Sequence, residues 1–285
     1  MRLATCLYKG HQRIVRQDGE LNIVLPKTVG SSLRAMLTDG TLRGLEKVAG
    51  ESVGVEQLAF LPPVTDPDKI LCIGFNYSDH NSETGADLPK YPSIFVRFSG
   101  SQVGHLTPIV APSISSQFDF EGELAVVIGK EGWRVPIEDA MHWVAGYTCF
   151  AENSVRDFQA HAKQATAGKN FEASGAIGPW LTTADEVPNP KDLQLTTRVN
   201  GMVMQHARLS SLVFSIAELI AYISSFTRLL PGDIISTGTP SGVGFLRDPA
   251  VWLKPGDRME IDIPGVGCLA NRVISEEEFV VAGAQ

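Results

Sequence analysis

Residues 118–129 read Phe-Asp-Phe-Glu-Gly-Glu-Leu-Ala-Val-Val-Ile-Gly, with two acids at the start of an apolar run. Residues 125–128 are apolar on both faces of the strand that they predict, which indicates a strand buried on both sides. Side chains two residues apart in a strand share a face, so Glu121 and Glu123 point the same way. Their carboxylates are then roughly 7 Å apart and repel each other by on the order of 2 kcal/mol at an effective dielectric of about 20. A bound divalent cation would relieve that repulsion.

A third acid, Glu152, follows a second predicted strand at residues 143–150. Three carboxylates with open positions are a ligand set that suits Mg²⁺ or Mn²⁺ when a substrate completes the shell. Zinc fits less well, because no His or Cys accompanies the acids. The alternative is that the acids lie on the solvated face of a half-exposed strand.

The pattern along the chain predicts more strands than helices. Strands are expected at residues 70–75, 93–98, 124–128, 193–200, 233–236 and 258–263, and one clear helix is expected at 211–226 with Ser211 as its cap. Strands and helices do not alternate regularly, which favours a strand-dominated α+β fold. A proline cluster at 61–67 reads as a linker, which predicts a small N-terminal α+β domain over 1–66 and a catalytic domain over 67–285.

The composition favours a small-molecule substrate. The 285 residues carry a formal charge of −8 and no basic run, which argues against nucleic acid or an anionic membrane as a partner. No apolar segment reaches the eighteen or so residues of a membrane span, and the N-terminal residues do not resemble a signal peptide. The four cysteines form no CxxC pair and are interpreted as reduced thiols. We therefore expect a cytoplasmic protein.

A polar segment at residues 76–85 follows the strand at 70–75. In one helical turn His80 and Glu83 share a face, and a carboxylate beside an imidazole fixes its tautomer and stabilises its protonated form. A general base that activates water needs this arrangement. A short polar helix is unstable alone, which suits a lid that orders on substrate. The alternative is an ordinary surface helix with a solvated histidine.

Three further segments hold candidate binding residues. If residues 152–159 are helical, Glu152, Arg156 and Gln159 lie along one side, and Arg156 binds a substrate carboxylate or pairs with Glu152. Lys169 is expected in a loop, where its ammonium stabilises a developing enolate or faces water. The glycine-rich loop at 238–244 lacks the pattern of a nucleotide-binding loop, and Thr239 within it is a candidate for the wall of a pocket.

Together these residues resemble the fumarylacetoacetate hydrolase family, in its acylpyruvase and fumarylpyruvate hydrolase-like branch. The resemblance covers residues 69–271 through motifs that include Gly-Phe-Asn-Tyr-x-x-His, Phe-Asp-Phe-Glu-x-Glu-Leu, Arg-Asp-Phe-Gln and Thr-Gly-Thr-Pro-Ser-Gly-Val-Gly. It implies a mixed β-sandwich roll of that family's C-terminal-domain type, a homodimer, and Mg²⁺ or Mn²⁺, with Ca²⁺ as an alternative.

The resemblance also implies a role for each candidate. The family's metal ligands fall on Glu121, Glu123 and Glu152, although the third ligand is usually Asp. Its other site residues fall on His80, Glu83 and Lys169 as catalytic residues and on Arg156, Gln159 and Thr239 as substrate-binding residues. Arg97 stands where many relatives carry Lys-Pro, and it is expected to affect which acid is accepted.

The reaction that this resemblance implies first is hydrolysis of a carbon–carbon bond in a β-diketo acid of the acylpyruvate or fumarylpyruvate type, in the catabolism of aromatic compounds. His80 with Glu83 would direct water onto the distal carbonyl, and Lys169 would stabilise the leaving enolate. One alternative is decarboxylation of oxaloacetate-like acids, or hydration or isomerisation of aromatic ring-cleavage products, on the same site. Another is a metal-binding scaffold without catalysis.

Overall fold

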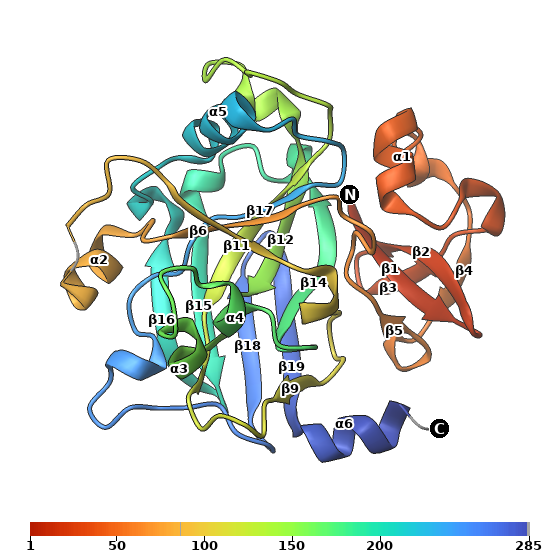
Figure 1. Cartoon of the computed structure of the whole chain (residues 1–285). Helices are drawn as coiled ribbons and strands as arrows, with labels where there is room; N and C mark the ends of the chain where they lie inside the picture. Colours follow the sequence, from red (N-terminus) through yellow and green to blue (C-terminus); the bar gives the residue numbers. More distant parts are fainter. Residues whose placement is uncertain (86, 284–285) are drawn as a thin grey trace.

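Strand β11 (Gly122–Ile128) lies in the interior of the protein, and every residue in it is buried. The computed structural model describes residues 1–85 and 87–283, and it places β11 between β12 (Val144–Ala151) and β17 (Ile234–Ser236) (Figure 1). Both neighbours run antiparallel to β11. The predicted strand at 124–128, buried on both faces, is confirmed, and it begins two residues earlier than expected.

Within the described residues, one large mixed sheet has the strand order β4-β3-β2-β1-β14-β12-β11-β17-β6-β7. Its other strands on this path are β1 (Arg2–Tyr8), β2 (His11–Asp18), β3 (Leu21–Val24), β4 (Glu51–Val53), β6 (Ile70–Gly74), β7 (Ser93–Arg97) and β14 (Gly175–Thr183). Two short strands join it from the side: β5 (Ala59–Phe60) pairs with β1, and β8 (Gln102–Val103) pairs with β14. Strands β6 and β17 are parallel, so the sheet is mixed.

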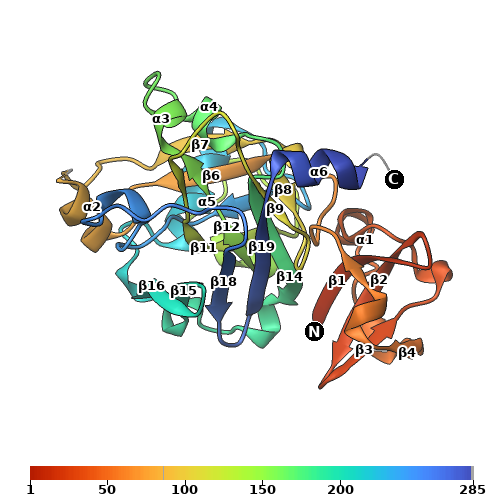
Figure 2. The same cartoon turned by 90° about the horizontal axis from the view of Figure 1, so that it is seen from below.

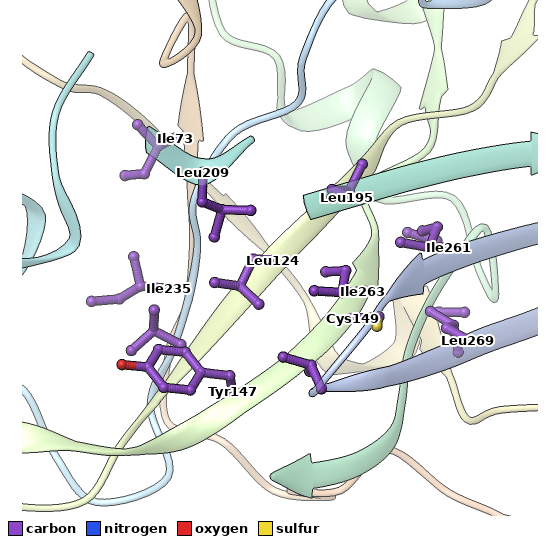
Figure 3. Packing of buried hydrophobic residues seen from close by; sticks show 14 of the residues in the cluster. Ile73, Leu124, Tyr147, Cys149, Leu195, Leu209, Ile235, Ile261, Ile263 and Leu269 are labelled. Atoms are coloured by element: carbon purple, nitrogen blue, oxygen red, sulfur yellow. The ribbon is translucent and has the colours of Figure 1, made fainter. Parts of the chain in front are cut away.

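A second sheet packs against the middle of the first. Its order is β16-β15-β18-β19-β9. Its strands are β9 (Ile109–Ala111), β15 (Gln194–Val199), β16 (Met202–Arg208), β18 (Arg258–Ile263) and β19 (Gly267–Ser275). Leu124 and Tyr147 of the large sheet share one buried core with Leu195, Ile261 and Leu269 of the second sheet (Figure 3). The two packed layers confirm the predicted strand-dominated fold.

The N-terminal strands extend the large sheet. Strand β1 pairs antiparallel with β2 on one side and with β14 on the other, with Leu3 opposite Leu181 (Figures 1 and 2). Phe60 and Trp180 meet edge to face, with ring centroids 5.6 Å apart, in a buried apolar cluster that joins the two parts. The predicted domain boundary between residues 66 and 67 falls between β5 and β6, and it stays a prediction.

The described α-helices are short. They are α1 (Leu33–Asp39), α2 (Ser78–Thr84), α3 (Arg156–Gln159), α4 (Thr166–Lys169), α5 (Ile216–Phe226) and α6 (Glu276–Gly283). In residues 1–85 and 87–283, no helix is long and apolar enough to cross a membrane.

Helix α5 begins later than the sequence predicted. The expected cap, Ser211, is wrong, because Ser215 is the N-cap and forms a capping box with Glu218. The Ser215 side chain accepts from the Glu218 backbone N–H, and the Glu218 carboxylate accepts from the Ser215 N–H. This reciprocal pair satisfies two backbone donors that would otherwise lack partners at the helix start.

Candidate metal centre and active site

Glu121, Glu123 and Glu152 meet where β11 begins and β12 ends, at the ends of two inner strands of the large sheet. Gly122 and Ala151 face each other in the antiparallel ladder, and the Glu152 N–H donates to the Glu121 carbonyl at 2.9 Å. One carboxylate oxygen from each acid lies within 4.8 Å of the other two, and all three residues are buried. The structure therefore brings together the three acids that the sequence singled out.

Gly122 separates the two acids of β11, and its missing side chain lets the second sheet approach closely. A Cβ atom at this position would lie only 2.0 Å from Thr197 Oγ1 on β15. Any larger residue would push the second sheet away from the acids. In the Glu-Gly-Glu pattern the two glutamates thus supply the charges, and the glycine allows the second sheet to pack closely against β11.

Neighbouring charges decide how far each buried acid remains ionised. Burial opposes ionisation of Glu121, but Arg156 and Lys169 outweigh it and lower the pKa of Glu121 to about 2. Burial raises the pKa of Glu123 well above its usual range, and the charge of Glu152 adds to this. Burial also raises the pKa of Glu152, although Lys169 opposes the shift. Two of the three acids therefore carry an electrostatic cost that a divalent cation would offset.

Lys169 supplies a buried positive charge beside the acids. Its ammonium donates to Glu121 Oε1 at 2.9 Å and to Glu152 Oε2 and the Glu152 carbonyl, and the residue is 2% exposed. Burial lowers the pKa of Lys169, but the two carboxylates outweigh burial and raise it, so the ammonium stays charged. The predicted loop is wrong here, because Lys169 ends the short helix α4, which lies against β7 (Figure 2).

The acids fit a hard divalent cation. Glu121 Oε1 accepts from Ser154 Oγ, and Glu123 Oε2 accepts from Ser236 Oγ at 2.5 Å and from the Gly238 N–H at 2.7 Å. Among the described residues, the second oxygen of each of these two carboxylates has no hydrogen-bond partner, and both residues line a cavity. Oxygen ligands of this kind are those that Mg²⁺ and Mn²⁺ prefer.

Arg156 begins α3 and lies beside the acids. Its Nε donates to Asp119 Oδ2 at 2.9 Å, its Nη1 donates to Gln159 Oε1 at 2.9 Å, and its Nη2 lies 3.0 Å from Glu121 Oε1. The expected helix over 152–159 is wrong in its first half, because residues 154 and 155 form strand β13 with β10 (Phe118–Asp119). Arg156 and Gln159 nevertheless share one side of α3.

Asp119 is a member of the site that the sequence analysis missed. It is fully buried, and its carboxylate also accepts from the backbone N–H groups of Gly244 at 2.7 Å and Phe245 at 3.1 Å. Burial raises the pKa of Asp119 despite the ion pair with Arg156. Asp119 therefore joins the Arg156 guanidinium to the end of the glycine-rich loop.

Arg97 lies behind Glu152, away from the cavity lining. Its Nη1 donates to Glu152 Oε1 at 3.0 Å and to the Asn153 carbonyl at 2.9 Å, and its Nη2 donates to Ser174 Oγ at 3.0 Å. The residue is 3% exposed, and it is not among the residues that line the cavity. This geometry supports a role in holding Glu152 and gives no support to direct contact with substrate.

Helix α2 holds the predicted His80–Glu83 pair. His80 Nδ1 lies 3.2 Å from Glu83 Oε2, as expected for two residues on one helical face. The Glu83 carboxylate also accepts from the Gly242 N–H at 3.0 Å, and Asp79 Oδ2 accepts from Ser241 Oγ at 2.8 Å. The helix is thereby fastened to the glycine-rich loop, which places His80 against the cavity.

The cavity has a volume of about 690 Å³ and joins the predicted residues into one site. Its lining includes most of the candidates: His80, Glu121, Glu123, Glu152, Arg156, Gln159, Lys169 and Thr239. Glu83 and Arg97 do not line the cavity. Glu83 contacts His80 and Arg97 contacts Glu152, and both of these residues are in the lining. Lys163 and Phe245 also line the cavity, and the sequence analysis did not single them out.

Comparison with known proteins identifies relatives over most of the chain. Residues 69–274 match the family described as fumarylacetoacetate (FAA) hydrolase C-terminal. A mitochondrial oxaloacetate tautomerase of Rattus norvegicus is 44% identical over 219 residues, which cover 76% of this chain and 70% of that protein.

Two solved structures share the whole fold. The 5-carboxymethyl-2-hydroxymuconate delta-isomerase of Mycobacterium smegmatis superposes with a TM-score of 0.79 at 30% identity, over 97% of this chain and 99% of the other. The maleylpyruvate hydrolase of Sphingobium sp. SYK-6, solved with manganese(II) and pyruvate, gives a TM-score of 0.81 at 29% identity, over 96% and 99% of the two chains.

Proposed function

Because this chain belongs to the fumarylacetoacetate hydrolase family, we propose that it is an enzyme that interconverts the keto and enol forms of a small 2-oxo dicarboxylic acid such as oxaloacetate. The observation that carries this proposal is one cavity in which a fully buried ammonium, three converging carboxylates and a histidine with a carboxylate partner meet. Such a site suits chemistry that passes through an enolate.

This proposal changes the order of the reactions expected from the sequence. Hydrolysis of a β-diketo acid came first there, and the alternative on the same site was decarboxylation of oxaloacetate-like acids, or hydration or isomerisation of aromatic ring-cleavage products. The 44% identity to an oxaloacetate tautomerase and the fold shared with an isomerase support these alternatives better than hydrolysis. All three kinds of reaction pass through an enolate. They differ in the group that attacks the substrate or leaves it.

The residues around the cavity suit both a metal ion and an anionic substrate. A divalent ion held by Glu121, Glu123 and Glu152 would act as a Lewis acid toward the 2-oxo acid. The charge of the buried ion-pair cluster supports an anionic substrate. Three cations (Arg97, Arg156 and Lys169) pair with four carboxylates (Asp119 and the three glutamates), so a bound divalent cation leaves this cluster with a net charge of about +1.

Lys169 stabilises the charge that develops during reaction. Its ammonium is buried, charged and held by Glu121 and Glu152, so it needs no reorganisation when an enolate oxygen forms nearby. Arg156 and Gln159 are the groups that would hold a carboxylate of the substrate, because both line the cavity and are fixed to each other.

His80 moves the proton. Glu83 accepts at His80 Nδ1, which fixes the tautomer with Nδ1–H and leaves Nε2 as the basic nitrogen. In the keto-to-enol direction, Nε2 takes a proton from C3 of the substrate, the electron pair of that C–H bond forms the C2–C3 double bond, and the π pair of the C2 carbonyl moves onto the 2-oxygen. The 2-oxygen then takes one proton from solvent water and protonated His80 gives its proton to solvent, so no proton is gained or lost overall. The reverse direction returns the proton from His80 to C3.

Hydrolysis remains the second candidate, and one observation favours it. The same His80–Glu83 pair can direct a water molecule, and the fold is shared with a maleylpyruvate hydrolase solved with manganese(II) and pyruvate. Homodimer formation and a cytoplasmic location stay predictions from the sequence.

An assay that follows enol loss, pyruvate and CO₂ separates these functions. The purified protein with Mg²⁺ or Mn²⁺ is given oxaloacetate in its enol form, and enol loss is followed by ultraviolet absorbance while pyruvate and CO₂ are measured in parallel. We expect enol to convert to keto faster than CO₂ appears. Acylpyruvates that yield pyruvate faster than enol oxaloacetate converts would establish the hydrolase, and tight metal binding without any turnover would establish the scaffold.

A further inference from the structure

Gln205 on β16 does not line the cavity, but it forms a hydrogen bond with Thr239, which does. The Gln205 side chain is 1% exposed and makes three hydrogen bonds: Oε1 accepts from the Gly122 N–H at 2.9 Å, and Nε2 donates to the Pro240 carbonyl at 2.9 Å and to Thr239 Oγ1 at 2.8 Å.

Two backbone groups fix the orientation of the Gln205 amide. A flipped amide would set its NH₂ group against the Gly122 N–H and its oxygen against the Pro240 carbonyl. Both contacts would then be repulsive in a buried place, where unsatisfied polar groups are most costly. The NH₂ group therefore faces Thr239, and Thr239 Oγ1 must accept from it.

The Thr239 hydroxyl keeps one lone pair that neither Gln205 nor Gly122 uses. Oγ1 accepts from Gln205 and donates its hydrogen to the Gly122 carbonyl at 3.1 Å. A hydroxyl has one hydrogen and two lone pairs, so one lone pair remains. A ligand hydroxyl can donate to that lone pair, whereas a ligand carbonyl must first take the hydrogen away from Gly122.

We infer that Gln205 is a positioning residue that, by holding both Gly122 and Thr239, keeps the Thr239 hydroxyl donating to the Gly122 carbonyl and accepting from a ligand, so that the site favours a 2-hydroxy group, as in an enol, over a 2-oxo group. The inference rests on the proposed function for the substrate class. It assigns the preference to a buried amide that never touches the ligand.

A matched pair of small ligands tests this inference by binding alone. Lactate and pyruvate differ at carbon 2, where one carries a hydroxyl and the other an oxo group. Their dissociation constants are measured by calorimetry at saturating Mg²⁺, with the tighter-binding enantiomer of lactate, and their ratio gives the hydroxyl preference. The wild type, Gln205→Met, Thr239→Val and the double variant form a double-mutant cycle. Thr239→Ser and Gln194→Met on β15, outside the cavity lining, are measured as controls.

We expect Gln205→Met to reduce the hydroxyl preference at least fivefold in the wild-type background and less than twofold in the Thr239→Val background. Thr239→Val alone should reduce the preference roughly tenfold, as loss of one good hydrogen bond predicts, and Thr239→Ser should keep it. The Thr239 variants keep the inference falsifiable if Gln205→Met does not fold.

An unchanged preference in Gln205→Met, or an equal change in both backgrounds, would overturn the inference. A wild-type protein that binds pyruvate alone, or neither ligand, would overturn it as well. Because no turnover is needed, a protein that shows these shifts without tautomerising oxaloacetate would refute the proposed reaction and leave the role of Gln205 in place.

Discussion

The Arg97 guanidinium donates a hydrogen bond of 3.0 Å from Nη1 to Glu152 Oε1, and both side chains are almost completely buried. Glu152 is thus held between Arg97 on one side and the Lys169 ammonium on the other. Two fixed cations determine where the third acid of the trio places its oxygens. The position of the third predicted metal ligand is therefore set by residues on β7 and α4.

Replacing Arg97 should weaken both the fold and the metal site. Arg97→Met leaves the buried Glu152 carboxylate without one partner, which should reduce the free energy of unfolding by about 3–5 kcal/mol. Arg97→Lys restores a charge but not the planar set of donors, so it should recover part of the loss. Denaturant unfolding checks this, and Arg228→Met, at an exposed ion pair, is the control. A loss in Arg97→Met no greater than in the control would contradict this role.

His80 should carry most of the proton transfer. Removing a general base typically lowers kcat by roughly 10²- to 10⁴-fold, and we expect His80→Asn to fall in that range for enol oxaloacetate. His142→Asn, at an exposed histidine, should leave kcat unchanged. Glu83→Gln should have a smaller effect than His80→Asn, because it alters only the partner of the imidazole. A His80→Asn protein with near wild-type kcat would exclude His80 as the base.

Asp119 should matter for substrate binding more than for the chemical step. Asp119→Asn keeps the size of the side chain but weakens its hold on the Arg156 guanidinium and on the loop at Gly244. We expect KM to rise about tenfold or more, with a smaller change in kcat, because Arg156 is the group proposed to bind a substrate carboxylate. Asp157→Asn, at the residue that follows Arg156 in α3, is the matched control. An unchanged KM would argue against this link.

The protein should lose stability in mild acid partly because of His105. Burial lowers the pKa of His105 from 6.5 to about 4, and its Nδ1 accepts from the Ala270 N–H at 3.1 Å. The unfolded chain binds the proton near pH 6.5, so between about pH 6.5 and 4 the unfolded state holds more protons and stability falls as the pH falls. The contribution is fully present above pH 6.5 and is at most about 3 kcal/mol.

His105→Phe removes this titration. Its free energy of unfolding should be lower than that of wild type at pH 7.5, and the difference should shrink as the pH approaches 4.5. His142→Gln, at an exposed position, should show the pH dependence of wild type. Parallel curves for wild type and His105→Phe would show that His105 makes no contribution to acid sensitivity.

Local patterns in the sequence were enough to locate the acidic trio. The alternation of strand side chains and the apolar run after Glu123 predicted a buried strand with acids at its start, and the register between β11 and β12 then brings Glu152 to them. Arg97 was harder to place, because its contacts with Glu152 and Ser174 join residues 55 and 77 positions apart. The periodic patterns of a sequence do not reveal contacts between residues so far apart along the chain.

Other elements were missed because their sequence resembles a turn or loop. Strand β14 contains Gly178 and Pro179, which usually interrupt a strand, yet it is buried throughout and passes a register shift opposite Tyr147 and Cys149. Asp119 stood in the decisive stretch beside Glu121, but its role depends on Arg156 and a loop more than a hundred residues away. The contacts of Gln205 with Gly122 and Thr239 form only when the second sheet packs on the first, so the sequence could offer Gln205 as a pocket residue but not show what it holds.

The most direct test of the account is a manganese titration of the metal-free protein in which Mn²⁺ binding and enol-to-keto conversion of oxaloacetate are measured on the same samples. We predict one Mn²⁺ per chain, conversion that rises in step with occupancy, and loss of both in Glu123→Gln, with Glu131→Gln at an exposed position behaving as wild type. Full conversion by the metal-free protein, or unchanged Mn²⁺ binding in Glu123→Gln, would contradict the account.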